Sequence, residues 1–315
     1  MWPFIARRFA QATIAIIVTT FVVYIGLIQL GDPFSDKYEK TVRPEVQAAL
    51  RAKFGMDKPF FLRYLIYLKN LATGDLGIDF DKRRPVGELM SEAAPNTLRL
   101  AIVAIAIVML IGVTAGVLAA VFRSPFMDML VAVVAVLAVS IPSFVIGVML
   151  RGHVSGLHLS GIEIFPAIPH SFLVEVPWYK EVLLPAVTLA VHETAFVARL
   201  MQTSTMEVLG ADYIRTARAK GLSWFTVVRK HVVRNALLPV VNYAGISLGI
   251  LMGGALIIES IFQYNGIGRL FVNALLSNNN PIILAVAVYS LITFIVLSAL
   301  VDMLSAYLDP RIRLN

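Results

Sequence analysis

The stretch that decides the fold covers residues 206–239 and reads MEVLGADYIRTARAKGLSWFTVVRKHVVRNALLP. It is a long polar interval between two strongly apolar segments, and its pattern is that of folded structure. The basic residues in it or beside it are Arg199, Arg215, Arg218, Lys220, Arg229, Lys230 and Arg234. Only Glu207 and Asp212 oppose them. Basic clusters beside apolar spans are typical of the cytoplasmic side of a membrane, so we expect this stretch there.

Two short helices joined by a glycine elbow are expected within this stretch. Asp212 is a residue type that caps helices, and good helix formers follow it through Ala219. Gly221 is placed to end that helix, because glycine accepts the left-handed conformation of a helix end. Ser223 can cap a second helix, which runs through Pro239 into the next apolar segment.

Composition places the chain in a membrane. Hydrophobic residues make up 58% of the sequence and charged residues only 15%, and the mean hydropathy is +0.79. These values are far from those of soluble domains and predict an all-α polytopic membrane protein. The net charge of +7 could suggest nucleic-acid binding, but a basic excess on cytoplasmic loops explains it equally well. The absence of cysteine excludes disulfides, thiolate metal sites and a cysteine nucleophile.

Six apolar segments are long enough to cross a hydrocarbon core of about 30 Å. We expect them at 9–30, 100–122, 129–150, from about 182 onward, 237–258 and 281–301. The first follows a basic amino end and is expected to stay uncleaved, because its apolar run is too long for a signal peptide. With six spans, every short basic interval lies on one side, and both termini are then cytoplasmic.

The spans divide the chain into four regions. We expect a cytoplasmic amino end with the first span at 1–30, an extracytoplasmic segment at 31–96, a membrane domain at 97–304 with its cytoplasmic loop at 207–236, and a cytoplasmic tail at 305–315. Short helices are expected at 45–54 and 60–71. The interval 263–280 is interpreted as an outside loop.

Polar residues within the spans are candidates for lining a pathway. Ionisable groups in a span are costly and usually face a partner or an aqueous cavity, which makes Glu193 the leading candidate and His192 a second. A pair with a neighbouring helix, or a place near the lipid headgroups, would also explain Glu193. Ser140 and Pro142 interrupt the third span and suggest a kink, which either lines the pathway or reflects packing. Asn242, in the fifth span, is a further candidate.

Small residues recur at spacings that bring helix backbones together in lipid. Gly112 and Gly116 lie four residues apart in the second span, and Gly245, Gly249 and Gly253 repeat every four residues in the fifth. This spacing favours helix packing over a nucleotide-binding loop.

Catalytic and metal-binding motifs are missing. The sequence has no G-x-x-x-x-G-K-[ST] phosphate loop, so an ATPase site on this chain is excluded. It has no catalytic constellation either, and we assign no catalytic residues. His153, His158 and His170 with Glu163 have spacings that fit no compact metal motif, and we predict no metal site.

The chain resembles a known transporter family along nearly its whole length. DYIRTARAKG and RKHVVRNALLP are similar to the cytoplasmic EAA loop of bacterial ABC-importer permeases of the dipeptide, oligopeptide and nickel branch. Further motifs in the same order are FIARRF (4–9), GD-P (31–33), GDLG (74–77), NGIGRL (265–270) and DPRIR (309–313). Arg215 stands where many importers carry glutamate, and Arg234 stands where proline is common. These departures argue against carrying over a salt bridge from a glutamate at position 215 to the ATPase.

The resemblance implies a fold, a mechanism and a set of partners. The fold would be a type I ABC-importer transmembrane domain, and ATP with Mg would be bound by partner ATPases. The partners would be a homologous second permease, two ATPases and an extracytoplasmic solute-binding protein in the inner membrane. The residues that would couple to the ATPases are Asp212, Tyr213, Ile214, Arg215, Thr216, Ala217, Arg218, Lys220 and Gly221. In this arrangement Ile214 and Ala217 would contact either the ATPase or the membrane domain.

The cargo and the class of transporter leave alternatives. Di- and oligopeptides are the commonest cargo of the related permeases, while nickel and other small solutes are the alternative. An ion-coupled secondary transporter would show repeated halves, and none is clear in the sequence. A membrane-anchored assembly protein would tolerate changes to the cytoplasmic loop.

Overall fold

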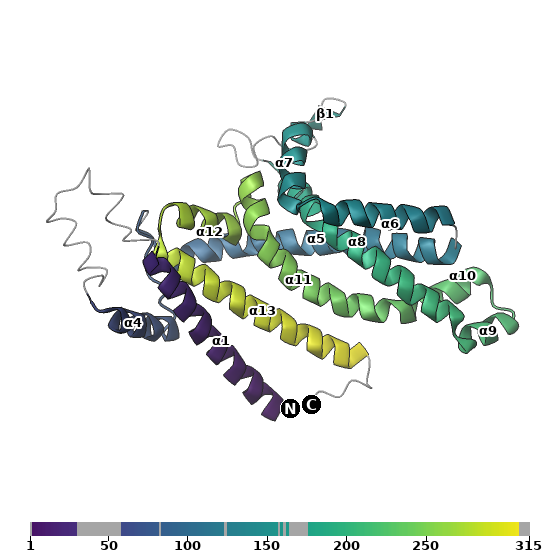
Figure 1. The fold of residues 1–315 in the computed structure, drawn as a ribbon, viewed down its shortest axis with the longest axis horizontal. Helices are drawn as coiled ribbons and strands as arrows, with labels where there is room; N and C mark the ends of the chain where they lie inside the picture. The colour runs from purple at the N-terminus through teal and green to yellow at the C-terminus, as the bar shows by residue number, and fades with distance from the viewer. Residues whose placement is uncertain are drawn as a thin grey trace. The chain divides into compact units, whose positions relative to one another are not determined.

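The computed structural model describes residues 2–29, 58–81, 83–122, 125–156, 158–159, 162–163 and 176–308. This part of the chain is helical apart from an antiparallel pair of short strands, β1 (His158–Leu159) and β2 (Ile162–Glu163). The helices are α1 (Trp2–Gln29), α4 (Phe60–Ala72), α5 (Val86–Phe122), α6 (Pro125–Ser140), α7 (Ser143–Val154), α8 (Trp178–Gly210), α9 (Asp212–Ala219), α10 (Trp224–Val227), α11 (Arg234–Phe262), α12 (Ile267–Leu276) and α13 (Asn280–Leu308), with a π-helical turn, η1 (Val228–Val233), between α10 and α11 (Figure 1).

The chain forms two compact units, and each is described by itself. The first unit consists of Met1–Pro95 and Asn265–Ile295, and the second of Asn96–Tyr264 and Val296–Asn315. The helices α5 and α13 therefore run from one unit into the other, whereas α6 to α11 belong to the second unit alone.

Several helices have the length and composition of membrane spans. Among the described residues, α5, α8 and the Asn280–Leu300 part of α13 meet both criteria, and the bent pair α6–α7 adds a fourth if it counts as one span. Thr13–Leu27 of α1 and α12 are shorter apolar helices. The predicted all-helical membrane class is confirmed, and the count of six spans stays a prediction.

The predicted kink in the third span is confirmed. The segments Val131–Ser140 and Ser143–Val154 meet at 93°. Pro142 stands at the break with φ −54° and ψ 138°, as the residue before the first turn of α7. Proline has no N–H to donate and restricts the residue before it to extended conformations, so the helix ends at Ser140 and begins anew.

Two polar intervals are more helical than predicted. We expected the extracytoplasmic segment to continue to residue 96, but α5 begins at Val86 and contains Pro95 within it. We expected a loop at 263–280, but α12 occupies most of that interval. The short helix expected at 60–71 is confirmed as α4. The helix expected at 45–54 and the motifs at 31–33 and 309–313 lie outside the described residues.

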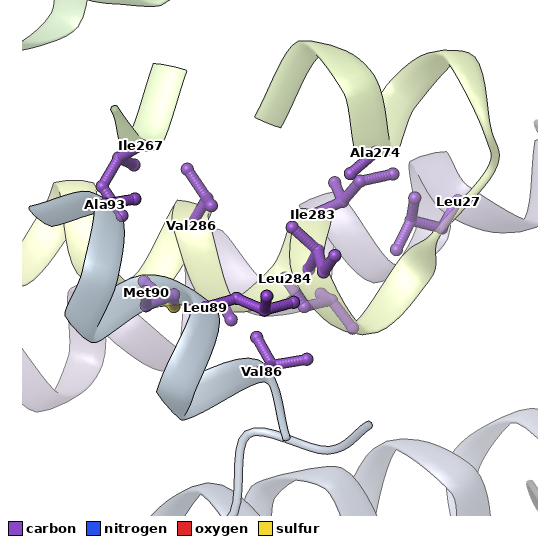
Figure 2. Packing of buried hydrophobic residues seen from close by; sticks show 12 residues of the cluster. Leu27, Val86, Leu89, Met90, Ala93, Ile267, Ala274, Ile283, Leu284 and Val286 are labelled. Carbon is purple, nitrogen blue, oxygen red and sulfur yellow. The ribbon is translucent and has the colours of Figure 1, made fainter. Parts of the chain in front are cut away.

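The start of α5 is amphipathic, which explains why it was missed. Val86, Leu89, Met90 and Ala93 are buried at helical spacing, while the positions between them are exposed and include Glu88. Figure 2 shows these apolar side chains facing α12 and the first turns of α13 in the core of the first unit. The further members of this cluster are Leu27, Ile267, Ala274, Ile282, Ile283, Leu284, Ala285 and Val286.

The GDLG motif forms a tight turn that is anchored to the start of α13. The carboxylate of Asp75 accepts the backbone N–H of Gly77 at 2.9 Å, and Gly77 has φ +85°, which glycine adopts without strain. Two residues later, Asp79 accepts the backbone N–H of Asp81 at 2.9 Å and the side-chain amide of Asn279. Asp79 and Asn279 are 3% and 2% exposed. The segment after the GDLG motif and the residue before α13 therefore meet in one buried polar contact.

In the second unit, α5 and α8 approach closely at glycines. A Cβ added at Gly112 would lie 2.8 Å from Cγ1 of Val197, and one at Gly116 would lie 2.4 Å from the backbone oxygen of Ala198. Both distances are too short for a real side chain, so these positions require glycine as long as the helices keep this spacing. The remaining glycines of the predicted packing set, Gly245, Gly249 and Gly253, lie in α11.

Candidate coupling element and transmembrane polar site

The helix α9 follows α8 after a single extended residue. Ala211 has φ −73° and ψ 145° and precedes the first helical turn, with no side-chain cap on it. The prediction that Asp212 caps this helix is therefore wrong, because Asp212 is itself the first helical residue. A carboxylate in the first turn still interacts favourably with the amino end of the helix dipole.

The elbow after α9 forms as predicted. Gly221 has φ +79°, and its N–H bonds to the carbonyl of Arg218 at 2.9 Å. Ser223 caps the next helix, since its Oγ accepts the N–H of Thr226 at 3.4 Å. These contacts satisfy backbone groups that a helix end would otherwise leave without partners.

The second helix of the element runs into the next apolar segment, as predicted. The turn α10 passes without a break through η1 into α11, and the residues at both junctions, Val228 and Arg234, are helical. Pro239 lies inside α11. A displacement of the elbow therefore acts on one continuous helical segment, from α10 through η1 to α11.

One face of α9 packs on its own chain. Ile214 is 2% exposed and Ala217 8% exposed, and they form a cluster with Val227 and Val232. Of the two contacts that the sequence left open for Ile214 and Ala217, the structure has the one within the membrane protein. This apolar cluster fixes α9 against the α10–η1 segment.

The other face of α9 is exposed and polar. Its exposed polar residues are Asp212, Tyr213, Arg215, Thr216 and Arg218, and Lys220 follows at the end of the helix. Arg215 pairs with Asp212 at 3.5 Å, but their side chains are 78% and 95% exposed. Ion pairs at such exposure contribute little to stability, so this face is available to a partner.

An apolar patch borders the elbow. Leu222, Trp224 and Phe225 are 41%, 43% and 72% exposed. The guanidinium of Arg218 lies 5.2 Å from the ring centre of Trp224, and that of Arg229 lies 5.9 Å from that of Phe225. The patch is therefore covered in part by cations from the same loop, an arrangement that stabilises an exposed ring.

Glu193 is joined to α11 by two hydroxyl groups. Tyr243 donates to Oε2 of Glu193 at 2.9 Å, and Ser247 donates to the same oxygen. The sequence singled out Glu193 but missed both donors. Their spacing of four residues on an otherwise apolar helix was the available signal, since such residues share a face.

The other predicted pathway residues lie on α8, on α11 and at the break between α6 and α7. His192 is half-buried, and its Nδ1 is enclosed without a hydrogen-bond partner among the described residues. Ser140 is exposed and donates to the carbonyl of Val136 at 2.7 Å, next to the break marked by Pro142. Asn242 is half-buried on α11, one residue before Tyr243. The hydrogen bonds to Glu193 therefore come from side chains that the sequence did not name.

A second carboxylate in this unit is fully buried. The exposed fraction of Glu259, near the end of α11, is 0%. Thr97 donates to Oε1 of Glu259 at 2.6 Å. Nearby, Tyr264 donates to the carbonyl of Asn96 at 3.2 Å, and burial raises the pKa of Tyr264 to about 12. Protein groups rather than lipid headgroups therefore surround this carboxylate.

Comparisons with known proteins agree with this architecture. Residues 112–314 match the family described as binding-protein-dependent transport system inner membrane component, and residues 1–101 match the amino-terminal part described for the same kind of protein. The chain is 34% identical to a dipeptide transport system permease of Bacillus subtilis, over 99% of this chain and 97% of that protein. It is 35% identical to an oligopeptide transport system permease of Haemophilus influenzae, over 99% of this chain and 100% of that protein. A glutathione transport system permease of Escherichia coli is 31% identical over 99% of each chain.

Solved structures show the same fold at lower sequence identity. The MetNI methionine ABC transporter, in an inward-facing conformation, contains a chain that is 21% identical, with a TM-score of 0.55 over 70% of this chain and 96% of that chain. An amino acid ABC transporter structure gives a TM-score of 0.51 at 15% identity, over 70% and 94% of the two chains.

Proposed function

Because the chain belongs to the family of binding-protein-dependent transport system inner membrane components, we propose that it is the permease subunit of an ATP-driven importer of di- and oligopeptides. The observation that carries this proposal is the similarity along 99% of the chain to permeases named for dipeptide and oligopeptide transport. The glutathione permease among the relatives also carries a short peptide. Nickel and other small solutes remain the alternative cargo.

The exposed face of α9 is the proposed contact with an ATPase partner. The buried pair Ile214 and Ala217 holds this helix on its own chain, so that only the opposite, polar face is open for docking. A short helix held at one face can dock into a groove on a cytoplasmic partner. Closure of the ATPases on ATP would then push α9, and the push would pass through the elbow to α8 and α11 as a rigid-body movement.

The remaining subunits and the orientation follow from this assignment. The chain would pair with a homologous second permease, two ATPases and a solute-binding protein on the outer side of the inner membrane. ATP and Mg would be bound by the ATPases. The loop 207–236 and both termini would then be cytoplasmic, which the basic residues of the loop favour.

The test is ATP-dependent uptake of labelled di- and tripeptides by the reconstituted complex, together with retention of the ATPases during purification. Thr216→Trp places a bulky side chain on the exposed face of α9, where the hydroxyl of Thr216 only donates to the carbonyl of Asp212. The matched control is Thr114→Trp, since Thr114 is exposed on α5 and donates to the carbonyl of Leu110 in the same way.

We expect Thr216→Trp to lose both uptake and bound ATPases, and Thr114→Trp to keep its ATPases. Full ATPase retention and uptake in Thr216→Trp would overturn the coupling role of α9. Failure of the wild-type complex to import any peptide, while another solute stimulates its ATP hydrolysis, would overturn the peptide cargo alone.

A further inference from the structure

The carboxylate of Glu193 has one oxygen engaged and one open. The hydroxyl groups of Tyr243 and Ser247 both donate to Oε2. Oε1 accepts no hydrogen bond from the described residues, and it is not among the enclosed polar atoms. A carboxylate can accept about four hydrogen bonds, so half of this group's capacity is directed away from its own chain.

The charge of Glu193 is also uncompensated within the described residues. No lysine or arginine there forms an ion pair with it, and its two donors are neutral hydroxyls. Glu193 lies in α8, a helix with the length and composition of a membrane span. Placing a carboxylate in a membrane span costs free energy unless a cation or water contacts it. A positively charged group would therefore bind favourably at the open oxygen.

Two stacked aromatic rings adjoin the carboxylate through the hydroxyl of Tyr243. Phe196 follows Glu193 by three residues and stacks on Tyr243, with ring centres 4.3 Å apart and an angle of 27° between the planes. Phe196 is 51% exposed. Residues three apart on a helix are neighbours on one face, and an aromatic face attracts a cation placed over it. The exposed ring and the open oxygen therefore favour the same kind of ligand.

From this arrangement we infer that Glu193, Phe196, Tyr243 and Ser247 form a site for a primary ammonium group in transit through the permease. Tyr243 and Ser247 orient the carboxylate by holding Oε2, while Oε1 accepts from the ammonium and Phe196 covers it. The identity of the ligand as the ammonium of a peptide rests on the proposed function. That ammonium is either the amino terminus or a lysine side chain.

Other cations fit this geometry less well. A guanidinium prefers two parallel hydrogen bonds to both oxygens of a carboxylate, and here one oxygen is already held by two hydroxyls. A metal ion would need several ligands, and no group of three or more His, Cys, Asp or Glu side chains able to hold one is present among the described residues. An ammonium is a compact donor that a single oxygen can accept.

The absence of cysteine in this chain permits a direct test. Ile246→Cys places a unique thiol three residues after Tyr243, on the same face of α11, at a position that is 56% exposed and has no polar role. The purified complex would be treated with cationic 2-aminoethyl methanethiosulfonate or anionic 2-sulfonatoethyl methanethiosulfonate. Labelling would be read as the mass shift of this chain alone, and the two rates would be divided by those of a free small thiol.

We expect the cationic reagent to react faster, and Glu193→Gln to lower the ratio of the two rates by about fivefold or more. Glu193→Asp should keep most of the ratio, because it retains the charge. Glu207→Gln is the matched control: it removes a carboxylate from the same helix about 21 Å further along, and it should leave the ratio unchanged. An equal ratio in Glu193→Gln and the parent would overturn the site, as would a thiol that neither reagent reaches because a second permease covers it.

Peptide protection then identifies the ammonium. Millimolar trialanine should slow labelling by the cationic reagent, whereas N-acetyl-trialanine should not. Protection by N-acetyl-Ala-Lys-Ala as well would show that a side-chain ammonium is also accepted, and protection by trialanine alone would restrict the site to the amino terminus. Equal protection by the acetylated trialanine would overturn the inference. Peptide uptake by the wild-type complex is measured separately. If the complex imports peptides but Glu193→Gln leaves the ratio of the two rates unchanged, only the site is refuted. If Glu193→Gln lowers the ratio but the complex imports no peptide, only the cargo is refuted.

Discussion

The side-chain amide of Asn235 donates a hydrogen bond to the hydroxyl of Tyr213, with 3.1 Å between Nδ2 and Oη. The same amide also donates to the carbonyl of His231 at 2.9 Å. Tyr213 belongs to α9 and Asn235 to the first turn of α11, so this contact bypasses the elbow and joins the two helices directly. A force on α9 therefore has two routes to α11, one along the backbone and one through these side chains.

Replacing Tyr213 by phenylalanine should loosen this connection without unfolding α9. The change keeps the ring and removes one hydrogen bond, which is worth about 0.5–1.5 kcal/mol. We expect more ATP hydrolysed per peptide imported, by about threefold, with normal amounts of assembled complex. Tyr179→Phe, at an exposed tyrosine of α8, is the control. If the Tyr213→Phe complex hydrolyses as much ATP per imported peptide as the wild type, the contact between Tyr213 and Asn235 does not contribute to coupling.

The left-handed conformation of Gly221 restricts which residue types this position tolerates. A Cβ there would meet open space within 4 Å, and φ is +79°, so the backbone rather than a clash sets the cost. Gly221→Val should cost about 1–2 kcal/mol at the elbow and lower uptake by about tenfold. Asparagine tolerates this conformation, so Gly221→Asn should retain most activity. Equal uptake by the two variants would argue against backbone strain as the cause.

The approach of α5 to α8 should not tolerate a methyl group at Gly116. The added Cβ would lie 2.4 Å from a backbone oxygen, which cannot rotate away, so the helices must separate. We expect Gly116→Ala to destabilise the complex by about 1–3 kcal/mol, measured as a lower melting temperature in detergent. At Gly152 in α7 nothing lies within 4 Å of an added Cβ, and Gly152→Ala should be neutral or slightly stabilising. A Gly116→Ala protein as stable as the parent would contradict the close packing.

The buried Glu259 makes its partner Thr97 sensitive to the loss of one hydroxyl. Thr97→Val keeps the shape of the side chain but removes the donor at 2.6 Å from Oε1. Weakening the support of a fully buried carboxylate costs about 1–3 kcal/mol, so the melting temperature should fall. Thr97→Ser keeps the hydroxyl and should restore most of the stability. If Thr97→Val and Thr97→Ser have the same melting temperature, the hydroxyl makes no measurable contribution to stability.

Local sequence signals predicted the features that depend on neighbouring residues. The left-handed Gly221, the cap at Ser223 and the break at Pro142 each follow from the backbone preferences of one residue type. The cap at Asp212 failed because Ala211 supplies the extended residue before the helix. A residue type that suits a cap also suits the first helical turn, and the sequence alone does not separate the two positions.

Features that depend on contacts between distant residues were missed in the sequence. The first turns of α5 bury an apolar face against α12 and α13 (Figure 2). The helical spacing of these apolar residues was the available signal, but it does not say which segments cover the face. The donors to Glu193 lie 50 and 54 residues along the chain. Only the packing of α11 on α8 brings them together.

The π-helical turn η1 adds one residue to the helical segment between α10 and α11. A π turn holds one more residue than the α-helical turn it replaces, while the helices on either side keep their direction. Shortening the segment Val228–Val233 by one residue would therefore convert it to an ordinary turn and leave α10 facing as before. In an uninterrupted helix, the same deletion would swing everything before it by about 100°. The chain can thus lose length at this point without changing which face of α9 is exposed.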